Sequence, residues 1–219
     1  MFFKMMYKII DSPKEYENLK GKKIPLHLEN PIDAVFINWG EIANPYLFDA
    51  GFTPNLITLC SLNFGILCGL CLVNACYRWA SFWYLMNYIL DCWDGNFARK
   101  YNMCSKFGDW FDHLKDYFVG GMLYYIIWFR LQLDFKVKFG FSALSLLLFM
   151  MSAIYFGYQE KFYKRYNDKA KPSDWLKFFT PYCKLHPIDG LKQFRWTGTG
   201  TYTMFVVVFL FSLELFVKS

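Results

Sequence analysis

Long apolar runs that alternate with short charged segments constrain this chain more than any other feature of its sequence. From Thr53 the chain continues for roughly twenty residues without a charged side chain, the length that an α-helix needs to cross the hydrocarbon core of a bilayer. Further apolar runs cover residues 139–156 and 201–217. Hydrophobic residues make up 55% of the chain and aromatic residues 22%, more than a soluble core of this size needs. The sequence therefore predicts an all-α, polytopic integral membrane helix bundle.

Two other apolar runs are too short to span a bilayer alone, and both border an acidic segment. The first ends at Leu90, directly before Asp91, and the second covers residues 117–129, directly after Asp116. Each run reaches spanning length only if its helix continues through the carboxylates. We therefore predict a helical hairpin with its turn within residues 100–107, and five membrane spans in total. A sixth span, or an interfacial or half-inserted helix, could lie within residues 160–200.

The N-terminal region has a more mixed composition than the rest of the chain. Residues 31–48 combine apolar and aromatic side chains with Asp33, Glu41 and Asn44, a pattern typical of an amphipathic helix at the membrane interface. A soluble lead-in that packs on the domain is the alternative. The first residues lack the apolar core and cleavage site of a secretory signal. We divide the chain into an N-terminal cytosolic segment with the interfacial helix, residues 1–52, and a transmembrane domain, residues 53–219.

Basic residues gather on one side of the five predicted spans. The groups are Lys20, Lys22 and Lys23, then Arg99, Lys100 and Lys106, and finally the loop 161–195. The positive-inside rule places this side, and the acidic segment with it, at the cytoplasm. The net charge of +6 comes from such loops and from no recognisable nucleic-acid-binding module, so we expect phosphate-bearing substrates and anionic lipids and no nucleic acid. The seven cysteines lack the spacing of a zinc site or a disulfide framework and are interpreted as small packing residues.

The acidic segment places carboxylates on two helix faces. Asp91 and Asp94 share the face of the first helix of the hairpin, and Asp112 and Asp116 share a face of the second. Four converging carboxylates repel one another, and bound divalent cations would relieve that repulsion. Ligands that offer only oxygen suit Mg²⁺ or Mn²⁺, and Mg²⁺ keeps coordination positions free for substrate phosphates.

Small and basic residues flank the four aspartates. Gly95, Ala98 and Gly108 leave room for a ligand at the backbone, and Arg99 could bind a phosphate oxygen. Small residues at these spacings also permit tight helix packing, and acids at helix ends are often solvated. The whole constellation has no stabilising purpose without a ligand, so we prefer the interpretation of a metal-bound diphosphate substrate.

The spacing of these residues resembles the motif of a known enzyme family. The pattern D-x2-D-G-x2-A-R-x8-G-x3-D-x3-D is similar to that of the CDP-alcohol phosphotransferases (CDP-alcohol phosphatidyltransferases). All eight fixed positions are present: Asp91, Asp94, Gly95, Ala98, Arg99, Gly108, Asp112 and Asp116. A match of this length is far more specific than a lone short motif. It implies a transferase of phospholipid synthesis that moves a phospho-alcohol group from a CDP-linked donor to an acceptor hydroxyl and releases CMP.

The resemblance also implies roles for individual residues. The four aspartates Asp91, Asp94, Asp112 and Asp116 would hold two Mg²⁺ or Mn²⁺ ions. Asp112 and Asp116 would be catalytic, with Asp116 completing the metal site or accepting the proton of the acceptor hydroxyl. The residues expected to bind substrate are Asn55, Thr58, Gly95, Ala98, Arg99 and Gly108. The family makes a homodimer the default expectation.

Two branches of the family resemble different parts of the chain. The region before and at the start of the first span, with Pro54, Asn55 and Thr58, and the sequence FGDWFDH at 107–113 look like the choline and ethanolamine phosphotransferases. This similarity favours CDP-choline or CDP-ethanolamine as donor and diacylglycerol as acceptor, in an endoplasmic reticulum-type membrane if the source is eukaryotic. The segment ARKYNMCSKFG from Ala98 resembles phosphatidylinositol synthases equally, which use CDP-diacylglycerol as donor.

Other residues and other protein classes leave alternatives open. His113 could assist proton transfer or be structural, and Asp109 could be a ligand or a solvated turn residue. Lys106 and Lys115 could hold phosphates or belong to the basic flank. Membrane prenyltransferases also use Asp-rich helices, but with a different spacing in two separated repeats. A carboxylate-lined divalent cation transporter would explain the aspartates but not the motif's small residues and Arg99.

Overall fold

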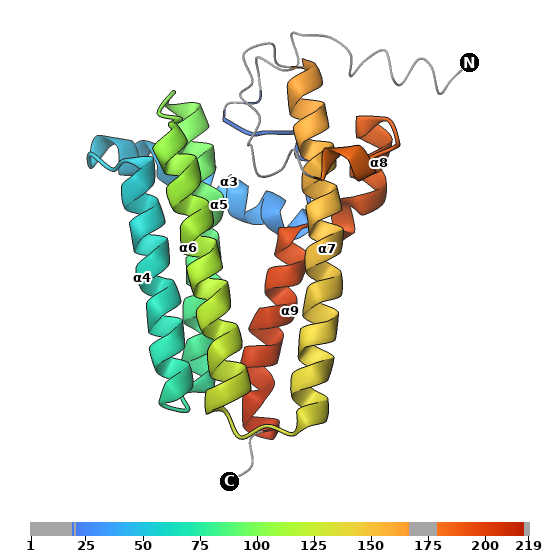
Figure 1. The fold of residues 1–219 in the computed structure, drawn as a ribbon. Helices are drawn as coiled ribbons and strands as arrows, with labels where there is room; N and C mark the ends of the chain where they lie inside the picture. Colours follow the sequence, from blue (N-terminus) through green and yellow to red (C-terminus); the bar gives the residue numbers. More distant parts are fainter. Residues whose placement is uncertain (1–18, 20, 167–178, 217–219) are drawn as a thin grey trace.

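The computed structural model describes residues 19, 21–166 and 179–216 (Figure 1). Every element in these ranges is helical, as predicted. Four parts of the predictions lie outside the described residues: the first eighteen residues of the N-terminal segment, Lys20, residues 167–178 of the long loop, and the end of the last span at Val217.

Helix α4, Pro54–Val73, begins where the sequence predicts the first span. The Thr53 side chain accepts a hydrogen bond of 3.3 Å from the Leu56 N–H, and Pro54 occupies the first turn, where its missing N–H leaves no bond unmade. After the helix ends at Asn74, Ala75 takes the left-handed backbone conformation, with φ +57°, and reverses the chain.

Helices α5, Tyr77–Lys100, and α6, Lys106–Tyr125, form the predicted hairpin. Both continue through the acidic segment without a break, so the carboxylates lie on helices, and the connection falls inside the predicted turn. Ser105 caps α6 by accepting a hydrogen bond of 3.0 Å from the Gly108 N–H. A π-helical turn, Ile126–Arg130, follows α6 and has no counterpart in the sequence predictions.

The second half of the chain contributes helix α7, Phe135–Tyr166, and helix α9, Thr199–Ser212, which a 3₁₀ turn extends over Leu213–Leu215. The apolar run at 139–156 lies inside α7, which extends beyond it at both ends and includes Lys136 and Lys138 at its start and Glu160 near its end. Figure 1 shows α4, α5 and α6 on one flank of the molecule and α7 with α9 on the other. Helix α5 packs between α4 and α9 and so joins the two flanks.

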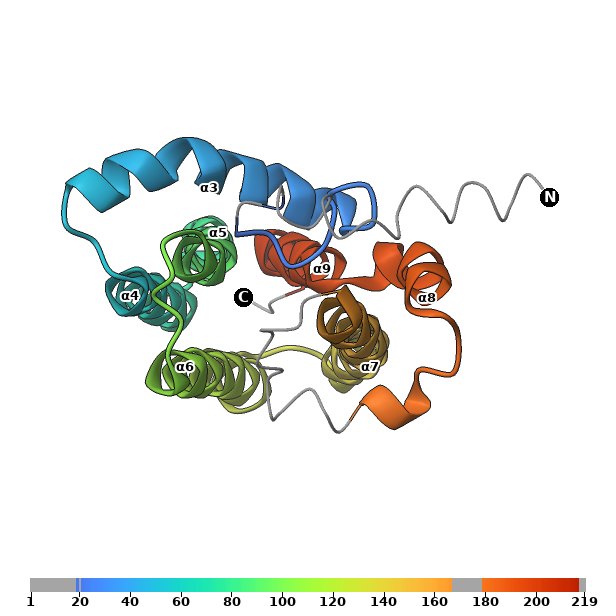
Figure 2. The same ribbon diagram turned by 90° about the horizontal axis from the view of Figure 1, so that it is seen from above.

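Helix α3, Pro31–Asp49, lies across one end of this bundle. Figure 2 shows α3 along its length, whereas α4, α5, α6, α7 and α9 are seen nearly end-on. Asn30 caps α3 by accepting a hydrogen bond of 3.0 Å from the Ile32 N–H. The long loop contains a short helix at this same end, α8, Pro187–Phe194, flanked by the 3₁₀ turns Thr180–Tyr182 and Arg195–Thr197.

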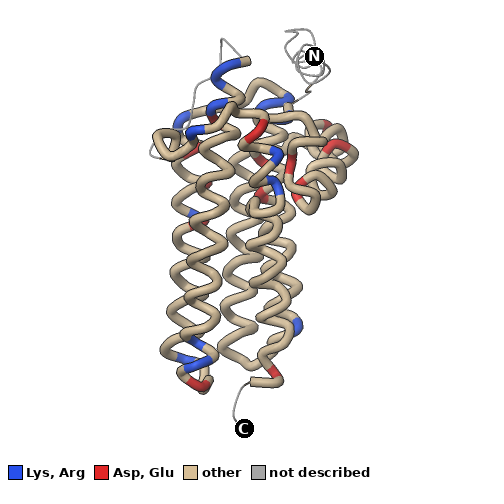
Figure 3. The backbone as a smooth tube through the Cα atoms, turned by 90° about the vertical axis from the view of Figure 1, so that its right-hand side faces the viewer, with Lys and Arg blue, Asp and Glu red and all other residues tan. Residues whose placement is uncertain are grey.

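Three helical stretches of the described chain are long and apolar enough to cross a membrane: Pro54–Val73, Phe135–Tyr166 and Pro187–Leu215. The protein is therefore a multi-pass membrane protein. Charged residues gather at the two ends of the bundle, most densely at the end that carries α3, and leave a nearly uncharged band between them (Figure 3). Large apolar side chains such as Leu70 on α4 and Leu146 on α7 stay exposed along this band, as expected of helices that face lipid.

The main apolar core lies toward the end of the bundle opposite α3. Its buried members include Leu72 of α4, Tyr84 of α5, Leu123 of α6 and Leu210 of α9. The end that carries α3 is held to a greater degree by buried polar contacts, and the acidic segment lies there.

Candidate active site

Hydrogen bonds between α3 and α5 fix the direction in which the first two aspartates point. Trp93 Nε1 donates to the Phe36 carbonyl oxygen at 2.8 Å, and Asn96 Nδ2 donates to Glu41 at 3.1 Å. The same face of α5 joins Tyr88 to Asp33, Asn96 to Asn44 and Lys100 to Glu41. Because this face is tied to α3, the face that carries the aspartates turns toward α4 and α6.

The four aspartates of the motif come together between α5 and α6. Carboxylate oxygens of Asp91, Asp94 and Asp112 lie within 4.8 Å of one another, and a second group within the same limit joins Asp112, His113 and Asp116. Asp94 is only 5% exposed, whereas the side chain of Asp116 is 52% exposed. The two carboxylate faces therefore meet, with Asp116 at the most open edge of the site.

Lys115 lies at the centre of these aspartates. Its side chain is fully buried, and its Nζ contacts the Asp91 carboxylate and lies 3.1 Å from Asp112 Oδ1 and 2.9 Å from Asp116 Oδ1. An ammonium group in this position offsets part of the repulsion between the carboxylates. The sequence suggested a phosphate ligand or a basic flank residue, whereas Lys115 is part of the carboxylate cluster itself. We call Asp91, Asp94, Asp112, Asp116 and Lys115 the aspartate site.

Helix α4 brings two of the predicted substrate-binding residues to the aspartate site. Thr58 is buried, and its hydroxyl donates a hydrogen bond of 2.6 Å to Asp94 Oδ2. A Cβ atom on Gly108 would lie 3.1 Å from Asn55 Oδ1, so α4 and α6 approach closely at this point. Thr58 thus contacts an aspartate directly, and Asn55 of α4 packs against the start of α6.

Arg99 points toward the N-terminal segment. Its Nε donates to the Gly21 carbonyl oxygen at 2.6 Å, and a Cβ atom on Gly95 would lie 3.2 Å from one of its terminal nitrogens. The space beside Gly95, which the sequence suggested for a ligand, is thus filled by the guanidinium group. Ala98, one turn along α5 from Asp94, is half-buried.

The remaining polar candidates lie at the edge of the site. His113 Nε2 is 3.8 Å from Asp109 Oδ1, one helical turn earlier, and Asp109 is 49% exposed. Lys106, at the start of α6, is exposed. Asp109 and Lys106 therefore have the exposure of solvated residues, whereas His113 lies in the same group as Asp112 and Asp116.

The carboxylates fit a divalent metal ion. Asp112 Oδ1 is buried and accepts no hydrogen bond from the described residues, although the Lys115 ammonium lies nearby. A buried carboxylate oxygen of this kind, beside those of Asp91 and Asp94, offers the hard oxygen ligands that Mg²⁺ and Mn²⁺ prefer. The aspartate site could therefore hold divalent cations.

Two further buried acids, Glu29 and Asp33, lie where α3 meets α7 and α9, and we call them the α3 acidic pair. Tyr155 and Gln159 donate hydrogen bonds of 2.8 and 2.9 Å to Glu29, and the Gly200 N–H donates to Asp33. Burial, with the charge of Glu29 adding to it, raises the pKa of Asp33 to about 8, and burial also raises the pKa of Glu29. The sequence predicts Asp33 only as a polar residue of an amphipathic helix, and its burial is a feature of the fold.

Comparison with known proteins gives one match. A protein-family model described as CDP-alcohol phosphatidyltransferase matches residues 52–212, a region that runs from the start of α4 to the end of α9 and contains the whole motif. No curated protein and no solved structure matches the chain.

Proposed function

This chain belongs to the CDP-alcohol phosphatidyltransferase family, and from that premise we propose that it transfers phosphocholine or phosphoethanolamine from CDP-choline or CDP-ethanolamine to diacylglycerol. The family assignment makes it an enzyme that moves a phospho-alcohol group from a CDP-linked donor and releases CMP. The meeting of all four motif aspartates at one place between two helices supports the transfer chemistry. The choice of donor rests on the similarity of the region around Pro54, Asn55 and Thr58, and of residues 107–113, to the choline and ethanolamine phosphotransferases.

The proposed reaction gives each aspartate a task. Asp91, Asp94 and Asp112 would hold a divalent cation, and Asp116 would accept the proton of the attacking hydroxyl as the new oxygen–phosphorus bond forms and the bond to CMP breaks. The half-exposed side chain of Asp116 supports this role, because a base must be accessible to the acceptor. A bound divalent ion would neutralise negative charge on the diphosphate. We propose Mg²⁺ or Mn²⁺ as that ion. The number of ions that the site can hold depends on the space and charge of Lys115 among the aspartates.

Residues around the aspartates are proposed to position the donor. Thr58 orients Asp94 through its hydrogen bond. Arg99 keeps two terminal nitrogens that make no hydrogen bond within the described residues, and they are available to a phosphate oxygen. The other proposed donor-binding residues are Asn55, Gly95, Ala98 and Gly108.

We propose that α5 and α6 also span the membrane, which gives five spans with α4, α7 and α9. The nearly uncharged band in Figure 3 supports this count. Helix α3 would lie at the interface, since Trp39 and Tyr46 are exposed along it. The basic residues Lys22, Lys23 and Lys100 at this end support a cytoplasmic position for the site. A homodimer is part of the same proposal.

The experiment that tests the proposal is CMP release by detergent-purified protein with Mg²⁺ or Mn²⁺. One arm supplies CDP-choline or CDP-ethanolamine with diacylglycerol, and the other supplies CDP-diacylglycerol with inositol, serine or glycerol phosphate. The proposal predicts product in the first arm. Product only in the second arm would place the lipid on the donor and contradict the proposed branch. Divalent cation uptake into vesicles without any CMP release would favour the transporter.

A further inference from the structure

Lys115 divides the four aspartates into two overlapping sets. Its ammonium group touches Asp91, Asp112 and Asp116. Asp94 instead receives the Thr58 hydroxyl at 2.6 Å, and its carboxylate lies within 4.8 Å of those of Asp91 and Asp112. One cation position, among Asp91, Asp112 and Asp116, is thus filled by the lysine, and a second set of three carboxylates includes one that the lysine does not contact.

We propose that Lys115 is a permanent cation of the active site, which replaces one of the two divalent ions that the family resemblance implies. The chain would then bind a single divalent ion through Asp91, Asp94 and Asp112. This inference rests on the proposed function, because it concerns the ion that binds the donor's diphosphate.

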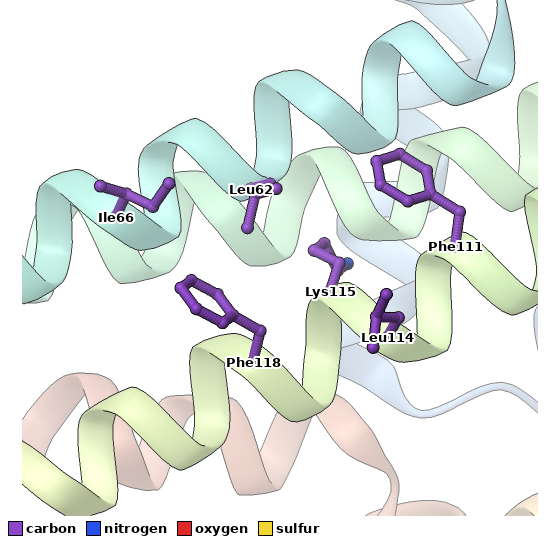
Figure 4. A pocket seen from close by; sticks show the side chains of 6 residues that line it. All are labelled: Leu62, Ile66, Phe111, Leu114, Lys115 and Phe118. Carbon is purple, nitrogen blue, oxygen red and sulfur yellow. The ribbon is translucent and has the colours of Figure 1, made fainter.

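The surroundings of Lys115 keep its ammonium group in place. The lysine also lines a cavity of about 320 Å³ between α4 and α6, whose other lining residues are all apolar: Leu62, Ile66, Phe111, Leu114 and Phe118 (Figure 4). If the side chain swung out of the aspartate site on this side, its charge would enter a pocket without a polar partner. The carboxylates are the polar groups within its reach, so Lys115 stays among them.

The position of the ammonium group also leaves no room for a second ion. Mg²⁺ binds oxygen ligands at about 2.0–2.1 Å, so an ion between Asp91, Asp112 and Asp116 would need the oxygens that Lys115 contacts. The two positive charges would also repel each other over a short distance. A divalent ion and the lysine therefore exclude each other there. The set that includes Asp94 shares Asp91 and Asp112 with the lysine, so an ion bound there would use Asp94 together with the other carboxylate oxygens of Asp91 and Asp112.

A lysine in this place would also assemble the site before any metal binds. Its charge holds carboxylates from α5 and α6 together, which would otherwise push the two helices apart. The aspartates are thereby arranged in advance for the single ion, and the donor's diphosphate would meet one mobile cation and one fixed cation.

The test is the number of Mn²⁺ ions bound by the purified full-length protein in detergent, measured with saturating Mn²⁺ and CDP. Equilibrium dialysis gives the stoichiometry, and electron paramagnetic resonance separates a lone ion from a pair, because two ions about 3.5–4 Å apart give a spin-coupled spectrum. We expect about one uncoupled Mn²⁺ per wild-type chain. Two coupled ions in the wild-type protein would overturn the proposal.

Three variants sharpen the measurement. Lys115→Ala removes the charge and frees its space, so the expected stoichiometry rises to about two coupled ions. Lys115→Met keeps the volume without the charge and should stay at one, and Lys106→Ala, on the exposed start of the same helix, should match the wild type. A folded Lys115→Ala protein that still binds one ion would also overturn the proposal.

This readout is independent of turnover. One ion in a protein that is inactive with both substrate pairs would count against the proposed substrates but support the role of Lys115. Two coupled ions in an active wild-type enzyme would reject the lysine and leave the proposed function intact. If Lys115→Ala does not fold, the wild-type stoichiometry alone decides.

Discussion

Two groups of acids lie at the same end of this molecule, one partly exposed and one buried, and they are stabilised in different ways. The aspartate site combines four carboxylates with the ammonium group of Lys115. The α3 acidic pair is instead surrounded by hydrogen-bond donors, with Tyr88 and Gly200 on Asp33 and Tyr155 and Gln159 on Glu29. The partners named for the α3 acidic pair are neutral groups, whereas the aspartate site holds a cation that contacts three of its four carboxylates.

The two kinds of partner suggest a structural role for the α3 acidic pair and a chemical role for the aspartate site. Glu29, just before α3, accepts hydrogen bonds from α7 at Oε1, and Asp33 in α3 accepts one from the Gly200 N–H of α9. Asp112 has a buried oxygen without a hydrogen bond from the described residues, and Asp116 opens to solvent. Burial of acids alone therefore does not distinguish the candidate site, and neither does a single unsatisfied oxygen, because Glu160 Oε2 is also buried without a hydrogen bond from the described residues. The convergence of several carboxylates distinguishes it.

The largest expected effect is on the rate of CMP release, when one acid of the aspartate site and one acid of the α3 acidic pair are each replaced by asparagine. Asp112→Asn should lower the rate of CMP release by on the order of 10³-fold or more, because a bound divalent ion supplies several kcal/mol of transition-state stabilisation. Asp33→Asn should stay near the wild-type rate, since a neutral side chain of the same shape can replace a largely protonated acid. The comparison fails if both variants lose activity equally while remaining folded.

A second prediction concerns stability without metal. Lys115→Ala leaves Asp91, Asp112 and Asp116 without their ammonium partner, so in the presence of EDTA it should lower the free energy of unfolding by about 3–5 kcal/mol. Mn²⁺ should recover most of that loss, because the ion replaces the missing charge. Thermal unfolding with EDTA and with Mn²⁺ measures this, and Lys106→Ala is the control. If Mn²⁺ does not raise the unfolding temperature of Lys115→Ala, the lysine does not act as a cation of the site.

A third prediction concerns Thr58, which bridges α4 and the aspartate site. Thr58→Val removes the 2.6 Å hydrogen bond to Asp94 at nearly constant volume and should weaken Mn²⁺ binding about 10–100-fold. Thr58→Ser retains the hydroxyl and should recover most of the affinity. Equal Mn²⁺ affinities of the valine and serine variants would mean that the hydrogen bond from residue 58 to Asp94 does not contribute to metal binding.

The smallest effect is the pH dependence of the α3 acidic pair. The pKa of Asp33 is about 8 in the folded protein, and the ordinary value of 3.8 applies to the unfolded chain. Between these pH values the folded chain holds a proton that the unfolded chain has lost. Stability should therefore fall as pH rises toward 8, by up to about 1.4 kcal/mol between pH 6.5 and 7.5. Asp33→Asn should reduce this slope in thermal unfolding measured across that range, and an unchanged slope would assign the pH dependence to other groups.

The sequence predicts much of the fold because its signals here are local. Thr53 and Pro54 indicate the start of α4. The apolar runs beside Asp91 and Asp116 are too short to span a bilayer alone, which predicts helices that include the acids. The π-helical turn Ile126–Arg130 has no such signal. Helix α7 extends beyond the apolar run because Lys136 and Glu160 mark the end of a hydrophobic stretch and not the end of a helix.

At the site, helix periodicity predicts which carboxylates share a face but not what lies between them. Lys115 is three residues after Asp112 and directly before Asp116, so its place on the inner face could have been noticed. Its burial depends on how closely α4 packs against α6, which no local pattern reports. The contact of Arg99 with Gly21 likewise joins segments 78 residues apart, and only the fold brings them together.

We propose that the aspartate site binds a divalent cation together with a CDP-linked diphosphate. Calorimetry with and without Mn²⁺ measures the affinity of the purified protein for CDP. Each ligand should tighten the binding of the other, and Asp112→Asn should abolish this coupling. CDP and Mn²⁺ that bind independently, or Mn²⁺ that binds without any CDP binding, would contradict it.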